Sequence, residues 1–299
     1  MKLKLQQFEG ASALLGSAVI YATFGLLIRE ISKMFGDATQ TFVRFAFATA
    51  LIALVNLAMR KKFRVPRGVV LKTAALGVLF AGLVVLFTIS VNATKIANSV
   101  FLLYAGSIVS SFLIGTFVLK EQVNRTKIIA IVIALAGLLM YSGAFAALNV
   151  GVIAGVCSGL LDGCANALRK SLKSVDRNTV IMYHYGFGSV FALAIVAATG
   201  GFAVGTVSLG PILATAVFVV LMLFLSNLLL FGFQHFDVNV GTVILATELF
   251  FATIFAFLLY HETPVPNEVV GGCLIFAASI VASVNFAEMF RRRRAKAVA

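Results

Sequence analysis

Residues 128–168 read IIAIVIALAGLLMYSGAFAALNVGVIAGVCSGLLDGCANAL, a stretch without lysine or arginine whose only acid is Asp162. As one α-helix it would be about twice as long as the ~30 Å hydrocarbon core of a bilayer, because each residue adds about 1.5 Å. The stretch is therefore expected to fold back on itself. Ser142-Gly143 and Asn149-Val150-Gly151 are the two places where the turn is expected.

The 299-residue chain as a whole has the same character, with 61% hydrophobic and only 12% charged residues. A soluble protein carries about 25% charged residues, so the composition excludes a soluble enzyme, a disordered protein and a secreted disulfide-built domain. It predicts an all-α integral membrane protein. Charges, glycines and prolines divide the chain into ten expected transmembrane helices. Their ranges are 11–33, 38–59, 73–93, 96–119, 128–146, 150–168, 179–199, 211–233, 238–260 and 268–290.

The basic residues indicate how these helices are oriented. Twenty of the 24 lysines and arginines fall in one set of alternating segments, which includes both ends of the chain and Arg169. Because cytoplasmic loops are rich in lysine and arginine, both termini are expected to be cytoplasmic, in a multi-pass protein of the inner or plasma membrane. The net charge of +13 then reports orientation, and nucleic acid is not an expected partner.

An internal repeat is the most specific signal in the sequence. The matching pairs are Glu121 with Glu262 and Asn98 with Asn239 at an offset of 141, and Arg29 with Arg169, Thr39 with Thr179 and Arg44 with His184 at an offset of 140. The repeat predicts two five-helix units, residues 1–147 and residues 148–299, the second of which ends in a basic cytoplasmic tail. A unit with an odd number of helices re-enters the membrane upside down, so the units are expected to be inverted repeats, as in secondary transporters with a midplane substrate site.

The helix ends Phe-Val-Leu-Lys-Glu121 and Leu-Leu-Tyr-His-Glu262, with the ten spans and the repeat, resemble the drug/metabolite transporter superfamily and its EamA-like family. Arg44-Phe45 is similar to an arginine that this family often carries in its second helix, and Glu248 lies where the second repeat often reads Leu-Glu-Pro. Leu249 replaces that proline, and the region around Ser107-Ile108 also lacks one. The resemblance implies an exporter of a small polar metabolite, an amino acid or a related compound.

Charged residues inside the expected spans are the main candidates for a site, because a charge at the bilayer centre costs about 2.5–3.5 kcal/mol. Glu248 lies near the middle of its span and is interpreted as a proton-coupling or substrate-amine group, or as a neutral carboxyl that joins the two halves. Asp162 shares a helix face with Ser158 and Asn166. That polar face is expected to line a cavity or to form a helix contact.

Arg44 and His184 occupy equivalent positions in the two repeats. Both could bind an anionic group of a substrate such as a carboxylate. Alternatively, Arg44 could extend to the outer membrane interface or pair with Asp37 and Glu30, while His184 forms an interhelical hydrogen bond. Hydroxyl and amide groups could add further substrate contacts. These are Tyr21, Thr23, Asn98, Tyr104 and Asn227.

The sequence thus predicts a secondary transporter with a small-molecule substrate, a coupling proton and the lipid bilayer as partners, and leaves a homodimer open. No catalytic residues, cofactor or metal are expected, since neither a phosphate loop nor a Ser-His-Asp set is present. The 28 phenylalanines are interpreted as core and lipid-facing bulk. One alternative is an exporter of cationic drugs that uses Glu248 and Asp162 as paired acidic ligands, and another is a membrane enzyme or a non-transporting scaffold.

Overall fold

The computed structural model describes residues 2–60, 66–140, 149–172, 175–260 and 265–283, and these residues are helical with short connections. The helices are α1 (Lys2–Tyr21), α2 (Phe24–Ser32), α3 (Asp37–Ala58), α4 (Arg67–Ala93), α5 (Ile96–Leu113), the π-helical turn η1 (Ile114–Val118), α6 (Arg125–Leu139), α7 (Val150–Ser171), α8 (Arg177–Ala198), α9 (Leu209–His235), α10 (Val238–Leu245), α11 (Glu248–Tyr260) and α12 (Pro266–Ser283). Within the described residues, eight helical segments are long and apolar enough to cross a membrane, while α6 and α12 are shorter.

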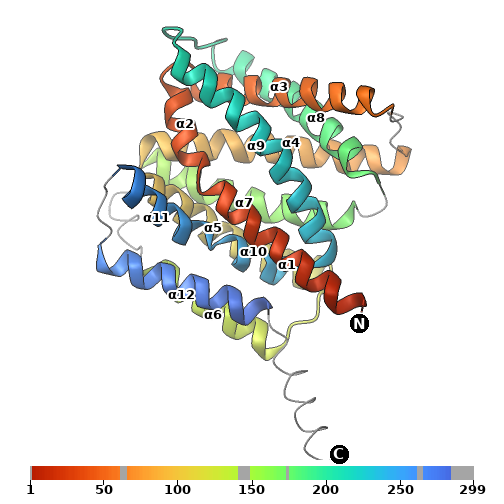
Figure 1. The fold of residues 1–299 in the computed structure, drawn as a ribbon, viewed down its shortest axis with the longest axis vertical. Coiled ribbons are helices and arrows are strands. Elements are labelled where there is room, and N and C mark those ends of the chain that lie inside the picture. Colours follow the sequence, from red (N-terminus) through yellow and green to blue (C-terminus); the bar gives the residue numbers. More distant parts are fainter. Residues whose placement is uncertain (1, 61–65, 141–148, 173–174, 261–264, 284–299) are drawn as a thin grey trace, which may run out of the picture.

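The helices form one bundle whose ends are made by helix pairs (Figure 1). At one end of the long axis α3 packs against α8, and at the other end α6 packs against α12. Between these pairs α7 packs closely against both α4 and α5, and α1 lies along α9. Helices from the first half of the sequence therefore pack mainly against helices from the second half.

The apolar stretch at residues 128–168 does not form a single helix. Helix α6 ends at Leu139 and α7 begins at Val150. The side chain of Asn149 caps α7, because its Oδ1 accepts a hydrogen bond from the backbone N–H of Val152 at 3.0 Å. The expectation of a turn inside this stretch is confirmed, with one candidate position at the cap of α7. Residues 142–143 lie outside the described part of the chain.

The closest packing in the bundle lies between α5 and α7 and depends on glycines of α7. A Cβ atom at Gly159 would lie 2.0 Å from the carbonyl oxygen of Leu103, and one at Gly163 would lie 2.0 Å from Oγ of Ser110. Small residues let two membrane helices approach until their backbones touch. This contact fixes the position of Asp162, which lies between the two glycines.

Gly159→Ala is expected to destabilise the protein by about 1–3 kcal/mol or more, because the added methyl group meets a backbone carbonyl that cannot rotate away. The measurement is the midpoint of thermal unfolding of the purified protein in detergent. Gly186→Ala is the matched control, since its Cβ would meet only Thr49, at 3.8 Å. Equal melting temperatures for the two variants would contradict the packing described for α5 and α7.

Two helices are interrupted at similar short sequences, Ile20-Tyr-Ala-Thr23 and Ile244-Leu-Ala-Thr247. Residues 22–23 separate α1 from α2, and residues 246–247 separate α10 from α11. In each break the threonine N–H and hydroxyl both donate to the carbonyl of the isoleucine three residues earlier, with hydroxyl distances of 2.7 Å. This is a tight 3₁₀-type turn. The helix therefore breaks before Glu248 although Leu249 replaces the expected proline.

Candidate functional site

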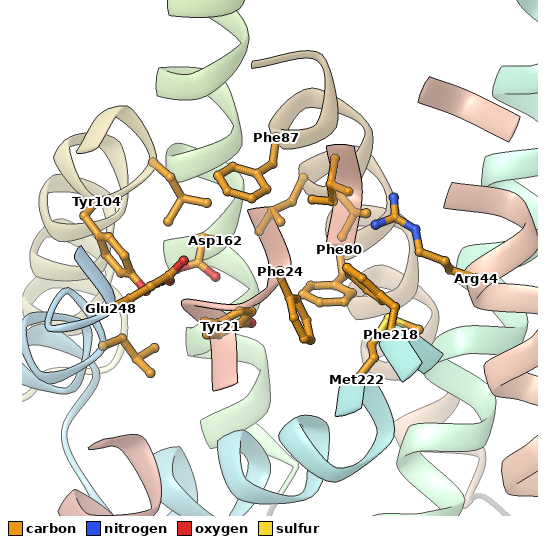
Figure 2. Close-up of a pocket in the computed structure, with 15 residues that line it drawn as sticks. Tyr21, Phe24, Arg44, Phe80, Phe87, Tyr104, Asp162, Phe218, Met222 and Glu248 are labelled. Carbon is orange, nitrogen blue, oxygen red and sulfur yellow. Dashed lines mark hydrogen bonds between the residues drawn. The ribbon is translucent and has the colours of Figure 1, made fainter. Parts of the chain in front are cut away.

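A narrow cavity of about 40 Å³ lies inside the bundle, beside both helix breaks (Figure 2). It is bordered by residues from α1 to α5, α7 and α9 to α11. The lining residues are Tyr21, Phe24, Ile28, Arg44, Phe80, Leu83, Val84, Phe87, Leu103, Tyr104, Asp162, Phe218, Met222, Leu245 and Glu248. All three charges that the sequence places well inside the spans border this one cavity.

Glu248 and Tyr104 form the acidic end of the cavity. The hydroxyl of Tyr104 donates a 2.6 Å hydrogen bond to Oε2 of Glu248. Glu248 is the first residue of α11 and is only 4% exposed. In the described part of the chain, no lysine or arginine lies within ion-pair distance of Glu248. A buried carboxylate without a cationic partner is costly, so this group can gain from binding a proton or a cation.

Asp162 lies at the same end but is surrounded by partners. It accepts hydrogen bonds from the Ser107 hydroxyl at 2.5 Å and from the Asn166 amide at 2.9 Å. Nη1 of Arg169 lies 3.8 Å from its second carboxylate oxygen. Arg169 also donates to Asn166 and has its guanidinium 5.0 Å from the centroid of the Phe80 ring. Asp162 is therefore part of a buried, largely neutralised network.

Arg169, which the sequence analysis placed in a basic segment after the expected span 150–168, belongs to helix α7 in the structure. The structure buries it to 2% exposure, because α7 continues to Ser171 and Arg169 lies two turns after Asp162 on the same face. That spacing of an acid and a base was a signal available in the sequence. Ser158, expected on this polar face, bonds instead to the carbonyl of Gly155 in its own helix.

Arg44 forms the opposite, basic end of the cavity. Its side chain is fully buried, and it donates to the carbonyl of Gln40 and to the hydroxyls of Thr41 and Thr88. Its Nη1 has no hydrogen-bond partner, and its guanidinium carbon lies 4.4 Å from the centroid of the Phe218 ring. Within the described residues no carboxylate forms an ion pair with it. A guanidinium held in this way is suited to bind an anionic group.

Neither acid considered as a partner for Arg44 forms an ion pair with it in the described structure. Glu30 pairs with Lys33, and Asp37 accepts a 2.6 Å hydrogen bond from Asn92. His184, the repeat equivalent of Arg44, is buried against the rings of Phe80 and Tyr185 and does not border the cavity.

The polar residues expected around the site divide into two groups. Tyr21 and Tyr104 border the cavity. The others do not: the hydroxyl of Thr23 is used at the first helix break, Asn98 lies in the first turn of α5, and Asn227 donates to the carbonyl of Leu223.

The middle of the cavity is aromatic, which the sequence did not indicate. Phe24, Phe80, Phe218 and Met222 lie between the acidic and the basic ends (Figure 2). They come from α2, α4 and α9, so no spacing along the chain marks them. The interpretation of the phenylalanines as core and lipid-facing bulk missed these positions.

A second polar cluster joins the two halves at the end of the bundle where α1 begins. Glu121 accepts hydrogen bonds from the backbone N–H groups of residues 238–239 at 2.8 and 3.0 Å, which is favourable at the start of α10. Lys170 contacts Glu121 at 2.6 Å and Asp237 at 2.9 Å, and Lys127 contacts Asp237 at 2.7 Å. These four side chains are called the ionic cluster below.

Asp237 gives the ionic cluster a predictable pH response. Burial raises its pKa, but hydrogen bonds from Lys127 and Lys170 outweigh burial and hold the pKa below its ordinary value of 3.8. A carboxyl with a lowered pKa stabilises the fold above its unfolded-state pKa, and this contribution is lost as the pH falls through the folded-state value. Asp237→Asn is therefore expected to melt below the wild type at pH 7, and the gap between the two melting temperatures is expected to begin to narrow as the pH falls below about 4.

Glu9→Gln, at an exposed carboxyl of α1, is the control for this pH series and should follow the wild type throughout. A constant gap between Asp237→Asn and the wild type from pH 7 to pH 3 would contradict the role of these ion pairs.

Together, the fold and the cavity define a multi-pass helical membrane protein with a buried polar site. The model of the EamA-like transporter family matches residues 8–143 and 148–284. The chain belongs to the EamA-like transporter family.

Two further similarities agree with this assignment. The chain is 24% identical over 278 residues to an uncharacterized transporter of Archaeoglobus fulgidus, and the match covers 91% of this chain and 96% of that protein. A solved crystal structure superposes with a TM-score of 0.74 at 16% identity, covering 92% of this chain and 98% of that one. At that identity the second similarity supports the fold alone.

Proposed function

We propose that this protein is a secondary transporter that exports a small polar metabolite, an amino acid or a related compound, by alternating access. The observation that carries the proposal is a single buried cavity bordered by a carboxyl and a guanidinium, Glu248 and Arg44, neither of which has an ion-pair partner among the described residues. Charged groups inside a membrane are typical of substrate and proton pathways. A site of this kind can recognise a metabolite through both of its charges.

The proposed architecture is ten transmembrane helices in two inverted five-helix repeats, 1–147 and 148–299, with both termini cytoplasmic. The family match in two consecutive segments, 8–143 and 148–284, supports this arrangement. The repeats would rock about a pseudo-two-fold axis around the cavity. The ionic cluster would then hold the cytoplasmic side closed in the present conformation, since it joins residues of both repeats.

Glu248 is the proposed coupling group. Its carboxyl can take either a proton or the amine of a substrate, and the two then compete for one buried position. Proton entry on one side of the membrane would release the amine there. Export would draw on the proton gradient in this way.

Export of cationic drugs remains the competing function, and it requires Glu248 and Asp162 as two free acidic ligands. Arg169 already lies beside Asp162, so of these two acids only Glu248 lacks a cationic partner among the described residues. Arg44 at the other end of the cavity also disfavours a substrate that carries positive charge alone.

An untargeted comparison of metabolites tests the proposed function. Cells that lack the protein are expected to retain at least one amphoteric metabolite that cells with the wild-type protein release. Cells that carry Glu248→Gln should behave like cells that lack the protein. The proposal fails if the wild type and Glu248→Gln give the same metabolite profile, or if only lipophilic cations differ.

A further inference from the structure

On the basis of the proposed function, we infer that the substrate carries its amine and its anionic group at opposite ends of an apolar body. An α-amino acid carries both charges on one carbon. The inference therefore narrows the substrate to an amphoteric molecule with separated charges, such as an ω-amino acid with an aromatic or aliphatic middle.

The first step of the argument is that the two ends of the cavity have opposite charge and belong to the same cavity. Glu248 and Tyr104 border one end, and Arg44 borders the other (Figure 2). Neither charge forms an ion pair within 4.0 Å among the described residues, and Nη1 of Arg44 is buried without any hydrogen-bond partner. Each end thus lacks a group that a ligand of opposite charge would supply.

The second step is that aromatic rings separate the two ends. The guanidinium carbon of Arg44 lies 4.4 Å from the centroid of Phe218, which lies 4.1 Å from that of Phe24, which in turn lies 5.5 Å from that of Tyr21. Tyr21 lies beside Asp162 at the acidic end (Figure 2). Three ring contacts in succession therefore lie between the guanidinium and the acidic end of the cavity.

The third step concerns the surface between the ends. Phe24, Phe80, Phe218 and Met222 line it and offer no hydrogen-bonding side-chain group apart from the weakly accepting methionine sulfur. Such a surface suits the apolar body of a ligand, while its few polar groups orient the two ends. If an ammonium and a carboxylate lay on one carbon, one of them would face these rings whenever the other was paired. A buried polar group without a partner costs about 1–3 kcal/mol, and more when it is charged.

A pair of isomers tests the inference without any mutation. Phenylalanine and 4-(aminomethyl)phenylacetate have the same formula and the same charges, but only the second carries its charges at opposite ends of the ring. Each is added to the purified wild-type protein in detergent at neutral pH, and the dissociation constant is derived from the concentration dependence of the melting temperature. We expect 4-(aminomethyl)phenylacetate to bind at least about tenfold more tightly, the effect of one additional charge-assisted hydrogen bond.

Two singly charged compounds assign each charge to its end of the cavity. 4-Ethylbenzylamine lacks the carboxylate, and 4-ethylphenylacetate lacks the amine. In Arg44→Met the zwitterion should bind no better than the amine, and in Glu248→Gln no better than the carboxylate. If either variant fails to fold, the order of the two isomers on the wild type decides the inference by itself.

The inference is overturned if phenylalanine binds as tightly as its isomer, or more tightly, and equally if neither isomer shifts the melting temperature. The proposed function is judged by a separate readout, because the release of metabolites from cells does not depend on these compounds. A transporter of α-amino acids would thus pass the metabolite test and fail the isomer test.

Discussion

Glu248→Gln is expected to reduce proton-gradient-driven efflux from proteoliposomes to the level of protein-free liposomes, while the protein still folds. The amide cannot exchange a proton or pair with an amine, so coupling is lost. It can still accept the hydrogen bond from Tyr104, and it has nearly the same volume as the carboxyl. The measurement is efflux of the solute found by the metabolite comparison, with and without a pH gradient, alongside the melting temperature.

Two further variants serve as controls for this result. Glu248→Asp keeps the carboxyl and should keep part of the gradient-driven flux. Glu9→Gln removes an exposed carboxyl of α1 and should transport like the wild type. Gradient-driven flux that survives in Glu248→Gln would exclude Glu248 as the coupling group.

Asp162→Asn is expected to cause the largest loss of stability among charge substitutions, about 3 kcal/mol, because it leaves Arg169 charged and buried beside a neutral amide. The measurement is the midpoint of thermal unfolding in detergent. The double variant Asp162→Asn/Arg169→Met removes the stranded charge as well and should recover much of the lost stability.

Glu30→Gln is the comparison for Asp162→Asn, because it breaks an ion pair with Lys33 that is largely exposed. It should cost less than about 1 kcal/mol. If the double variant were no more stable than Asp162→Asn, the loss would come from the Ser107 and Asn166 hydrogen bonds, and Arg169 would not be the reason.

The helical fold could be predicted from the sequence because a bilayer restricts what an apolar chain can do. Backbone groups in lipid must pair within the chain, so long apolar stretches become helices. The length of residues 128–168 alone required a turn, and Asn149 now caps the helix that follows it. The broken helices could not be predicted, because threonine forms their tight turns without the proline that usually marks a kink.

The charged residues of the candidate site could also be predicted, whereas the apolar residues that line it could not. Arg44, Asp162 and Glu248 stand out because a charge in a membrane is costly, and all three border the cavity. Phe24 and Phe218 are apolar residues in apolar helices, so only the packing of α2 against α9 shows that they meet.

Two of the expected polar residues that do not border the cavity have a common explanation. The side chains of Thr23 and Asn227 form hydrogen bonds to backbone carbonyls three or four residues earlier, an option that is open to any threonine or asparagine in a span. Arg169 looked like the first residue of a loop because the helix end was expected at residue 168. The helix instead ends at Ser171, which places Arg169 inside the bundle.

Solute counterflow tests the central claim, that this protein is a carrier with one cavity exposed alternately to each side. Proteoliposomes are loaded with the unlabelled solute found by the metabolite comparison and diluted into a trace of the labelled solute. A carrier exchanges one molecule for another, so labelled solute should accumulate inside transiently above its equilibrium level. Proteoliposomes with the wild-type protein or with Glu248→Asp should show this overshoot. Protein-free liposomes should not. Labelled solute that only approaches equilibrium, without an overshoot, would contradict alternating access.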